Sequence, residues 1–211
     1  MKIRRARSSD VDGMLALKAA LRFSESSGSS SRGGFLLGTD AAGYHMRIEH
    51  GLTWVMDDGQ IKGFAIVLPD GTFRQSAVWR RRDQVRWSAD RAELERSRLG
   101  YYDQLAVTRQ GGRRYGSALA LTALVDLMQQ GADYLVTATV TEPVENLAAV
   151  PYLRRLGGHT VGRLDEHYPA IGPLVSDIWV VPRAGYSAWM DGASTLAERW
   201  IRDLALGAVQ S

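Results

Sequence analysis

One segment near the middle of the chain constrains the fold more than any other: Leu105–Ala118, which reads LAVTRQGGRRYGSA. A strand-like run enters a turn rich in glycine and arginine, and a helix expected over about Gly116–Gln130 opens directly on that turn. The first backbone N–H groups of a helix have no partner within the helix, and the helix dipole adds partial positive charge there. Glycine lets a phosphate approach the backbone, and Arg113 and Arg114 add charge. The segment therefore predicts a pyrophosphate-binding site.

Two other phosphate-binding patterns fit this turn less well. The P-loop pattern requires a Gly-Lys-Ser/Thr ending, which is absent. The dinucleotide pattern should follow the first strand of a parallel βαβ unit, whereas this turn comes in mid-chain after a predicted hairpin. Two strand-like runs, Leu52–Met56 and Ile61–Leu68, indicate that hairpin because they flank the turn sequence Asp57-Asp58-Gly59-Gln60.

The rest of the chain alternates expected strands and helices without a convincing domain boundary, so we expect a single α+β domain over residues 1–211. The further strands are expected at Lys2–Arg7, Tyr101–Val107, Tyr134–Val140, His159–Leu164 and Ser176–Val181. The further helices are expected at Val11–Leu21, at Thr39–Glu49 with Thr39 as its cap, at Glu145–Leu156 and at Ala188–Leu206. The Ser- and Gly-rich residues 24–34 predict a mobile loop. Residues 74–98, rich in arginine and tryptophan, predict a partly helical insertion, and residues 186–211 a C-terminal helical extension.

Composition excludes several classes of protein. The chain has no cysteine, which removes disulfides, thiolate metal sites and a cysteine nucleophile. No apolar run approaches the roughly 20 residues that span a bilayer, and no apolar segment follows the basic start as in a signal peptide, so we expect a cytoplasmic protein without a membrane partner. The four histidines lack metal-ligand spacing, and we expect no metal site.

Two motifs resemble signatures of one family. Arg113-Arg114-Tyr115-Gly116-Ser117-Ala118 is similar to the phosphate loop of the GNAT superfamily of acyl-CoA N-acyltransferases, Arg/Gln-x-x-Gly-x-Gly/Ala, and matches it at every specified position. The upstream run Leu105-Ala106-Val107 resembles the family's central splayed strand, although the spacing from Val107 to Arg113 is about one residue longer than expected. Asn146, Ala149, Tyr152 and Gly157 are similar to the family's second signature, and three-residue spacing on one helix is expected to direct the first three toward a common ligand.

This resemblance implies a GNAT-like mixed sheet, mostly antiparallel and flanked by helices. It implies acetyl-CoA or another acyl-CoA as co-substrate and a small-molecule or peptide amine as acceptor, joined by direct attack in a ternary complex. The implied cofactor-binding residues are Leu105, Ala106, Val107, Arg113, Arg114, Tyr115, Gly116, Ser117, Ala118, Asn146 and Ala149.

The resemblance also assigns two catalytic candidates. Tyr152 would donate a proton to the departing thiolate; the alternative is an amphipathic residue that lines the core. Asp103 would act as general base, directly or through a water; an ion pair with a nearby arginine is an equally good interpretation. Topology suggests that Tyr44, Glu49, His167 and Tyr168 line the acceptor side.

Other functions stay open at this stage. The insertion's arginines and tryptophans are the kind of residues that contact phosphates and stack on bases, so the alternatives include a nucleic-acid-binding protein. Four acidic residues in the same stretch argue against it, and we do not favour nucleic acid as a partner. A non-catalytic acyl-CoA sensor is the second alternative. The amphipathic C-terminal helix would dock on its own core or on a second subunit of a homodimer.

Overall fold

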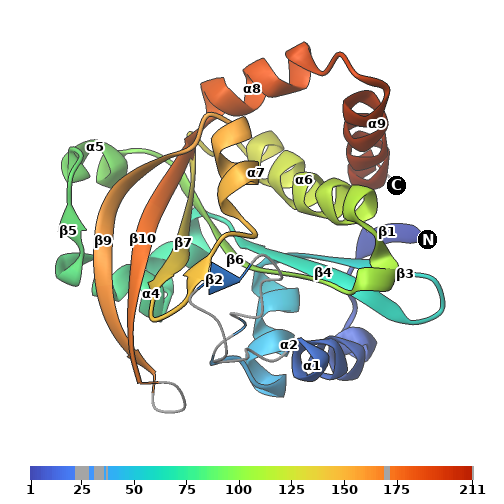
Figure 1. Cartoon of the computed structure of the whole chain (residues 1–211), viewed down its shortest axis with the longest axis horizontal. Coiled ribbons are helices and arrows are strands. Elements are labelled where there is room, and N and C mark those ends of the chain that lie inside the picture. The colour runs from blue at the N-terminus through green and yellow to red at the C-terminus, as the bar shows by residue number, and fades with distance from the viewer. Residues whose placement is uncertain (22–28, 31–35, 37, 169–171, 211) are drawn as a thin grey trace.

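The computed structural model describes residues 1–21, 29–30, 36, 38–168 and 172–210. Figure 1 shows a twisted sheet with helices on both faces. In spatial order the sheet contains β1 (Lys2–Arg5), β3 (Leu52–Asp57), β4 (Ile61–Leu68), β6 (Leu99–Val107), β7 (Tyr134–Glu142), β10 (Gly172–Pro182), β9 (His159–Tyr168) and β5 (Arg86–Trp87). Every neighbouring pair is antiparallel except β6 and β7, which are parallel. The expected mixed, mostly antiparallel sheet is confirmed.

Helices cover the two faces of the sheet in two groups, each with its own apolar core. One face carries α1 (Val11–Ala20) and α2 (Ala41–His50), which pack on β4 and β3. The opposite face carries α6 (Arg113–Gln129), α7 (Val150–Arg155), α8 (Arg183–Gly192) and α9 (Leu196–Gln210). α6 is the centre of this second core because its residues from Ala118 to Met128 are almost continuously buried. The α9 helix packs along α6, so it docks on its own core.

The sheet opens into a fork at its centre. β6 pairs with β7 only from Leu99 to Tyr102, although β6 continues to pair with β4 as far as Val107. At the point of divergence the Thr137 hydroxyl donates to the Tyr102 carbonyl over 2.9 Å. Asp103 is an extra residue in β6 opposite β4, since Tyr102 pairs with Val67 and Gln104 with Ile66. Such a bulge bends a strand, and past it no described residue pairs with the backbone of β6 on the β7 side.

The insertion is helical in part, as predicted, and also contributes a strand. It contains α3 (Asp70–Gln75), α4 (Ala77–Arg80), the 3-10 turn η2 (Arg81–Gln84), β5 and α5 (Arg91–Arg96). β5 pairs with β9 and forms the far edge of the sheet. The guanidinium carbons of Arg74 and Arg82 lie 4.8 and 4.9 Å from the centre of the Trp79 ring. The insertion is thus tied to the main sheet and stabilised by its own arginines.

Several expected elements are wrong in extent. α6 begins at Arg113 rather than Gly116, because Gly112 adopts the helix-capping position with a φ of 72°. The helix expected over Glu145–Leu156 is only α7; it is preceded by the two-residue strand β8 (Glu145–Asn146), which pairs with β2 (Ser29–Ser30). Pro151 lies in the first turn of α7, where its missing N–H costs nothing.

Two further corrections concern caps and breaks. Asp40, not Thr39, caps α2, and its carboxylate accepts from the Gly43 N–H over 2.8 Å. The expected C-terminal helix is two helices, α8 and α9, separated after Gly192. The loop predicted over residues 24–34 lies outside the described residues except for Ser29 and Ser30. Among the described helices, none is long and apolar enough to cross a bilayer.

Candidate active site

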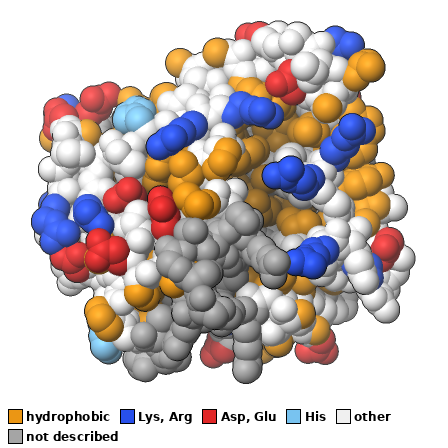
Figure 2. Space-filling model, viewed as in Figure 1, with side chains coloured by type: hydrophobic (Ala, Val, Ile, Leu, Met, Phe, Trp, Pro, Cys, Tyr) orange, Lys and Arg blue, Asp and Glu red, His pale blue; other side chains and the backbone are white. Residues whose placement is uncertain are grey.

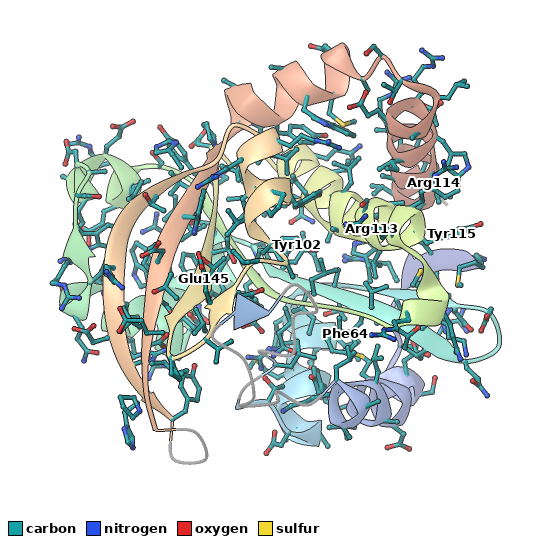
Figure 3. All side chains as sticks on the ribbon, viewed as in Figure 1. Phe64, Tyr102, Arg113, Arg114, Tyr115 and Glu145 are labelled. Atoms are coloured by element: carbon teal, nitrogen blue, oxygen red, sulfur yellow. The ribbon has the colours of Figure 1, made fainter. Side chains whose placement is uncertain are left out.

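The amino-terminal end of α6 lies directly after β6 and the short 3-10 turn η3 (Arg109–Gly111). The Thr108 hydroxyl accepts from the Gly111 N–H over 3.1 Å, and Gly112 then turns the chain into the helix. Arg113, Arg114 and Tyr115 form the first turn of α6, so their backbone N–H groups have no acceptor within the helix. Within the described part of the chain, neither arginine has an ion-pair partner. Figure 3 shows both at this end of α6.

The remaining residues of this motif have structural roles. The Gly116 N–H already donates to the Gly112 carbonyl over 3.1 Å, and a Cβ atom at Gly116 would lie 3.3 Å from the methyl carbons of Val107. Ala118 is fully buried, and the Ser117 hydroxyl donates to the Arg113 carbonyl. The glycine therefore sets how closely α6 packs on β6, and the anion site that this geometry offers consists of the first helical turn and its two arginines.

Tyr115 contacts the C-terminal helix through its side chain. Its ring lies edge-on to Trp200 of α9, with ring centres 5.0 Å apart. Only the backbone of Tyr115 is therefore directed to the anion site. Figure 2 shows Lys and Arg side chains around an apolar area that lies over α6 and α7, on the same face as this helix end.

The fork opens into a cavity of about 290 Å³ that contains the candidate catalytic residues. Six residues named from the sequence line it: Tyr152, Asp103, Leu105, Asn146, Ala149 and, beside the fork, Tyr168. Leu105 is 41 % exposed on the open part of β6, whereas the Ala106 side chain is buried. Asn146 and Ala149 precede α7, so the expected three-residue helical spacing with Tyr152 is wrong. The Asn146 amide oxygen instead accepts from the Ala148 N–H over 3.2 Å in a turn.

The hydroxyl of Tyr152 is buried and has no hydrogen-bond partner, which within the described chain is true of no other buried side-chain oxygen or nitrogen. A buried polar group without a partner is destabilising, so such a group calls for a functional explanation. Burial raises the pKa of this phenol, with a smaller contribution from Tyr186. The phenol therefore stays protonated at neutral pH and is available as a donor to a ligand in the fork.

Asp103 is held in an ion pair. Its Oδ2 atom accepts from Arg47 Nε of α2 over 2.5 Å, and both side chains are largely buried. Within the described chain its second oxygen, Oδ1, has no donor. The pairing agrees with one of the two interpretations of Asp103 offered by the sequence, and it leaves one carboxylate oxygen free for an incoming group.

Of the four residues that the sequence suggested for the acceptor side, only Tyr168 lines the cavity. Tyr44 is fully buried, and its hydroxyl donates to the Gln104 side chain over 3.0 Å, so it supports β6 from the face that carries α2. Glu49 and His167 are exposed and do not line the cavity, whereas Tyr168 does. The cavity is also lined by an ion pair that no sequence motif predicts, Arg81 with Glu166, whose charged atoms are 2.6 Å apart. These two residues are distant in the chain and meet because η2 lies over β9.

We expect the protein to lose stability above pH 10. Burial raises the pKa of Tyr101, Tyr102 and Tyr152, whereas an unfolded tyrosine titrates near pH 10. Below pH 10 both states are neutral; above it only the unfolded state releases these protons. The free energy of unfolding should then fall by about 1.4 kcal/mol per pH unit for each tyrosine. Melting temperatures between pH 8 and 11 measure this loss, and Tyr152→Phe should reduce its slope. An unchanged slope would contradict the prediction.

Neither a family model nor a curated protein sequence matches the chain, but many solved structures resemble it. The ribosomal-protein-alanine N-acetyltransferase from Brucella melitensis has a TM-score of 0.56 and 16% identity, with 86% of this chain and 99% of that chain covered. The protein yncA from Salmonella typhimurium, whose structure was solved with its cofactor acetyl-CoA, has a TM-score of 0.53 and 14% identity, with 86% and 93% covered. FeeM, an N-acyl amino acid synthase from uncultured soil microbes, has a TM-score of 0.53 and 14% identity, with 94% and 96% covered. The fold predicted from the two motifs is confirmed.

Proposed function

We propose that this chain, which has the fold of the GNAT acyltransferases, transfers an acyl group from an acyl-CoA to an amine. One observation carries the proposal: the open half of β6 leads from the fork through η3 into a glycine-capped helix whose two arginines have no ion-pair partner among the described residues. An extended ligand with amide groups at one end and a pyrophosphate at the other matches this arrangement.

The two ends of β6 support one mode of binding for the co-substrate. The N–H groups of Arg113, Arg114 and Tyr115, with both guanidinium groups, would hold the pyrophosphate. On the β7 side, where the described chain gives it no ladder partner, the backbone from Asp103 to Val107 would bind the amides of the pantetheine arm as a missing strand would. The thioester would then lie at the fork near Asp103 and Tyr152.

The chemistry at the fork requires a neutral amine, a polarised carbonyl and a protonated leaving group. The amine nitrogen attacks the thioester carbon, the carbon–sulfur bond breaks, and Tyr152 protonates the departing thiolate. The phenol is suited to this step because it is protonated and, in the part of the chain that is described, has no competing hydrogen-bond partner. The free oxygen of Asp103 would accept a proton from the amine, directly or through a water, while Arg47 fixes the carboxylate.

The nucleic-acid alternative gains no support from the insertion. Five of its eight arginines are engaged with carboxylates: Arg74 with Asp70, Arg82 and Arg91 with Glu95, Arg81 with Glu166, and Arg86 with Asp165. Paired guanidinium groups offer little free charge to a phosphate backbone.

Acetyl-CoA and free CoA should each raise the melting temperature, whereas ATP should not. A ligand at about 100 times its dissociation constant adds ~2.7 kcal/mol, or roughly 5–10 °C for a chain of this size. Thermal unfolding with the three ligands measures this, and ATP controls for simple binding of a nucleotide phosphate. The absence of a shift with either CoA species at millimolar concentration would overturn the proposed function.

A further inference from the structure

The cavity at the fork extends well beyond the reacting groups. From Asp103 it continues under the paired part of β6 and β7 to Leu99, and the insertion closes it from the other side. Its volume of about 290 Å³ is at the small end of ligand pockets, so it suits a compact molecule. The reaction of an acetyl group at the fork uses little of this space.

The far part of the cavity is apolar and aromatic. Phe73 stacks on Tyr101 with ring centres 4.9 Å apart, and Trp79 lies edge-on to Phe73 at 5.2 Å. Leu94 and Leu99 are buried and complete this end. Rings packed against one another hold a fixed shape, so this end favours an apolar group of matching size.

The charged groups of the cavity are already neutralised. Glu166 pairs with Arg81 at 2.6 Å and accepts from the Ser176 hydroxyl at 3.1 Å. Arg82 pairs with Glu95 at 3.0 Å. An occupant with a charge or a peptide backbone deep in the cavity would have to break these pairs or leave its own polar groups without partners. The far part of the cavity therefore selects against polar occupants.

We propose that the cavity binds the apolar body of a compact primary amine, whose amino group lies at the fork beside Asp103 and Tyr152. This inference rests on the proposed function and names its acceptor. The free oxygen of Asp103 suits an arriving amino group, whereas the methylenes of an acyl tail passing the same point would leave that carboxylate oxygen without a partner. The insertion, which covers the far end of the cavity, is thus a specificity element that disfavours an extended peptide.

The test compares amines at fixed acetyl-CoA. We expect kcat/KM for 2-phenylethylamine and hexylamine to exceed that for ethanolamine and for a peptide with an N-terminal alanine by about 10- to 100-fold. Ala138→Phe fills the cavity from β7 and should lower kcat/KM for 2-phenylethylamine at least ~10-fold, with an unchanged thermal shift by CoA. Val78→Phe fills it from α4 and replaces that variant if it fails to fold. Ala77→Phe, an exposed neighbour outside the cavity, is the matched control and should change neither value.

The outcomes separate this inference from the proposed function. A protein that binds CoA but acetylates ethanolamine or the peptide best would overturn the inference and leave the function standing. Faster turnover with octanoyl-CoA than with acetyl-CoA, lost in Ala138→Phe, would assign the cavity to the acyl tail and also overturn it. Failure to bind CoA at all would overturn the function itself.

Discussion

Replacing Tyr152 with phenylalanine is expected to lower kcat about 100- to 10,000-fold, the usual contribution of a general acid. Folding should not suffer. The hydroxyl is buried and has no hydrogen-bond partner among the described residues, so its removal leaves no other group unsatisfied there and removes a destabilising one. The melting temperature should therefore stay the same or rise. Steady-state kinetics with acetyl-CoA and the best amine, together with thermal unfolding, measure both effects.

The matched control is Tyr134→Phe. The Tyr134 hydroxyl donates to Glu93 over 2.8 Å at the surface, at the end of the β6–β7 pairing opposite the fork, and its loss should leave kcat unchanged. A Tyr152→Phe variant that binds CoA with full activity would show that the phenol is a core residue only. A protein that binds CoA while neither variant nor wild type transfers an acyl group to any amine would favour the sensor alternative.

The double charge reversal Arg113→Glu and Arg114→Glu should weaken CoA binding by at least ~100-fold. Each charge-assisted hydrogen bond to a phosphate contributes roughly 1.5–3 kcal/mol, and the new carboxylates would repel the pyrophosphate. The fold should tolerate the change because neither arginine has an ion-pair partner among the described residues, and acidic residues suit the first turn of a helix. Calorimetric titration with CoA at two salt concentrations gives the affinity.

The double reversal Arg80→Glu and Arg96→Glu is the control for net charge, because it also converts two arginines to glutamates. Both arginines are exposed and lie in the insertion, on α4 and α5, so their reversal should leave the affinity for CoA nearly unchanged. Equal losses in both proteins would indicate a general electrostatic effect rather than a phosphate site at α6. A loss confined to turnover would likewise contradict the assignment.

Local chemistry explains which parts of the fold were predictable. The β3–β4 hairpin follows from Asp-Gly turn residues between two β-rich runs, and it forms within one residue of the prediction. The start of α6 was predicted about one turn too late, at Gly116. The helix begins at Arg113 because Gly112, which caps it, adopts a positive φ. The residues before α7 favour a helix by composition, but they extend to pair with β2, a contact that local propensity does not encode.

The site was predictable only where a short motif encodes it. Arg113 and Tyr152 lie within such motifs, and the structure places them at the two ends of the open strand. The fork depends on where β7 stops pairing with β6, and the ion pair of Asp103 depends on α2 packing against β6. Arg81 meets Glu166 only because the insertion lies over β9. Such contacts between distant segments leave no periodicity in the sequence.

The two-residue strand β5 should also protect the folded chain against self-association. Without the insertion, β9 would be the sheet's last strand, and its ten residues would present unpaired backbone groups to other molecules. Exposed edges of that length recruit strands from neighbouring chains and lead to aggregation. β5 covers the middle of β9, and the ion pair between Arg86 and Asp165 places charges on the new edge. A shortened chain that lacks residues 74–98 would therefore lose protection against self-association as well as the apolar end of its cavity.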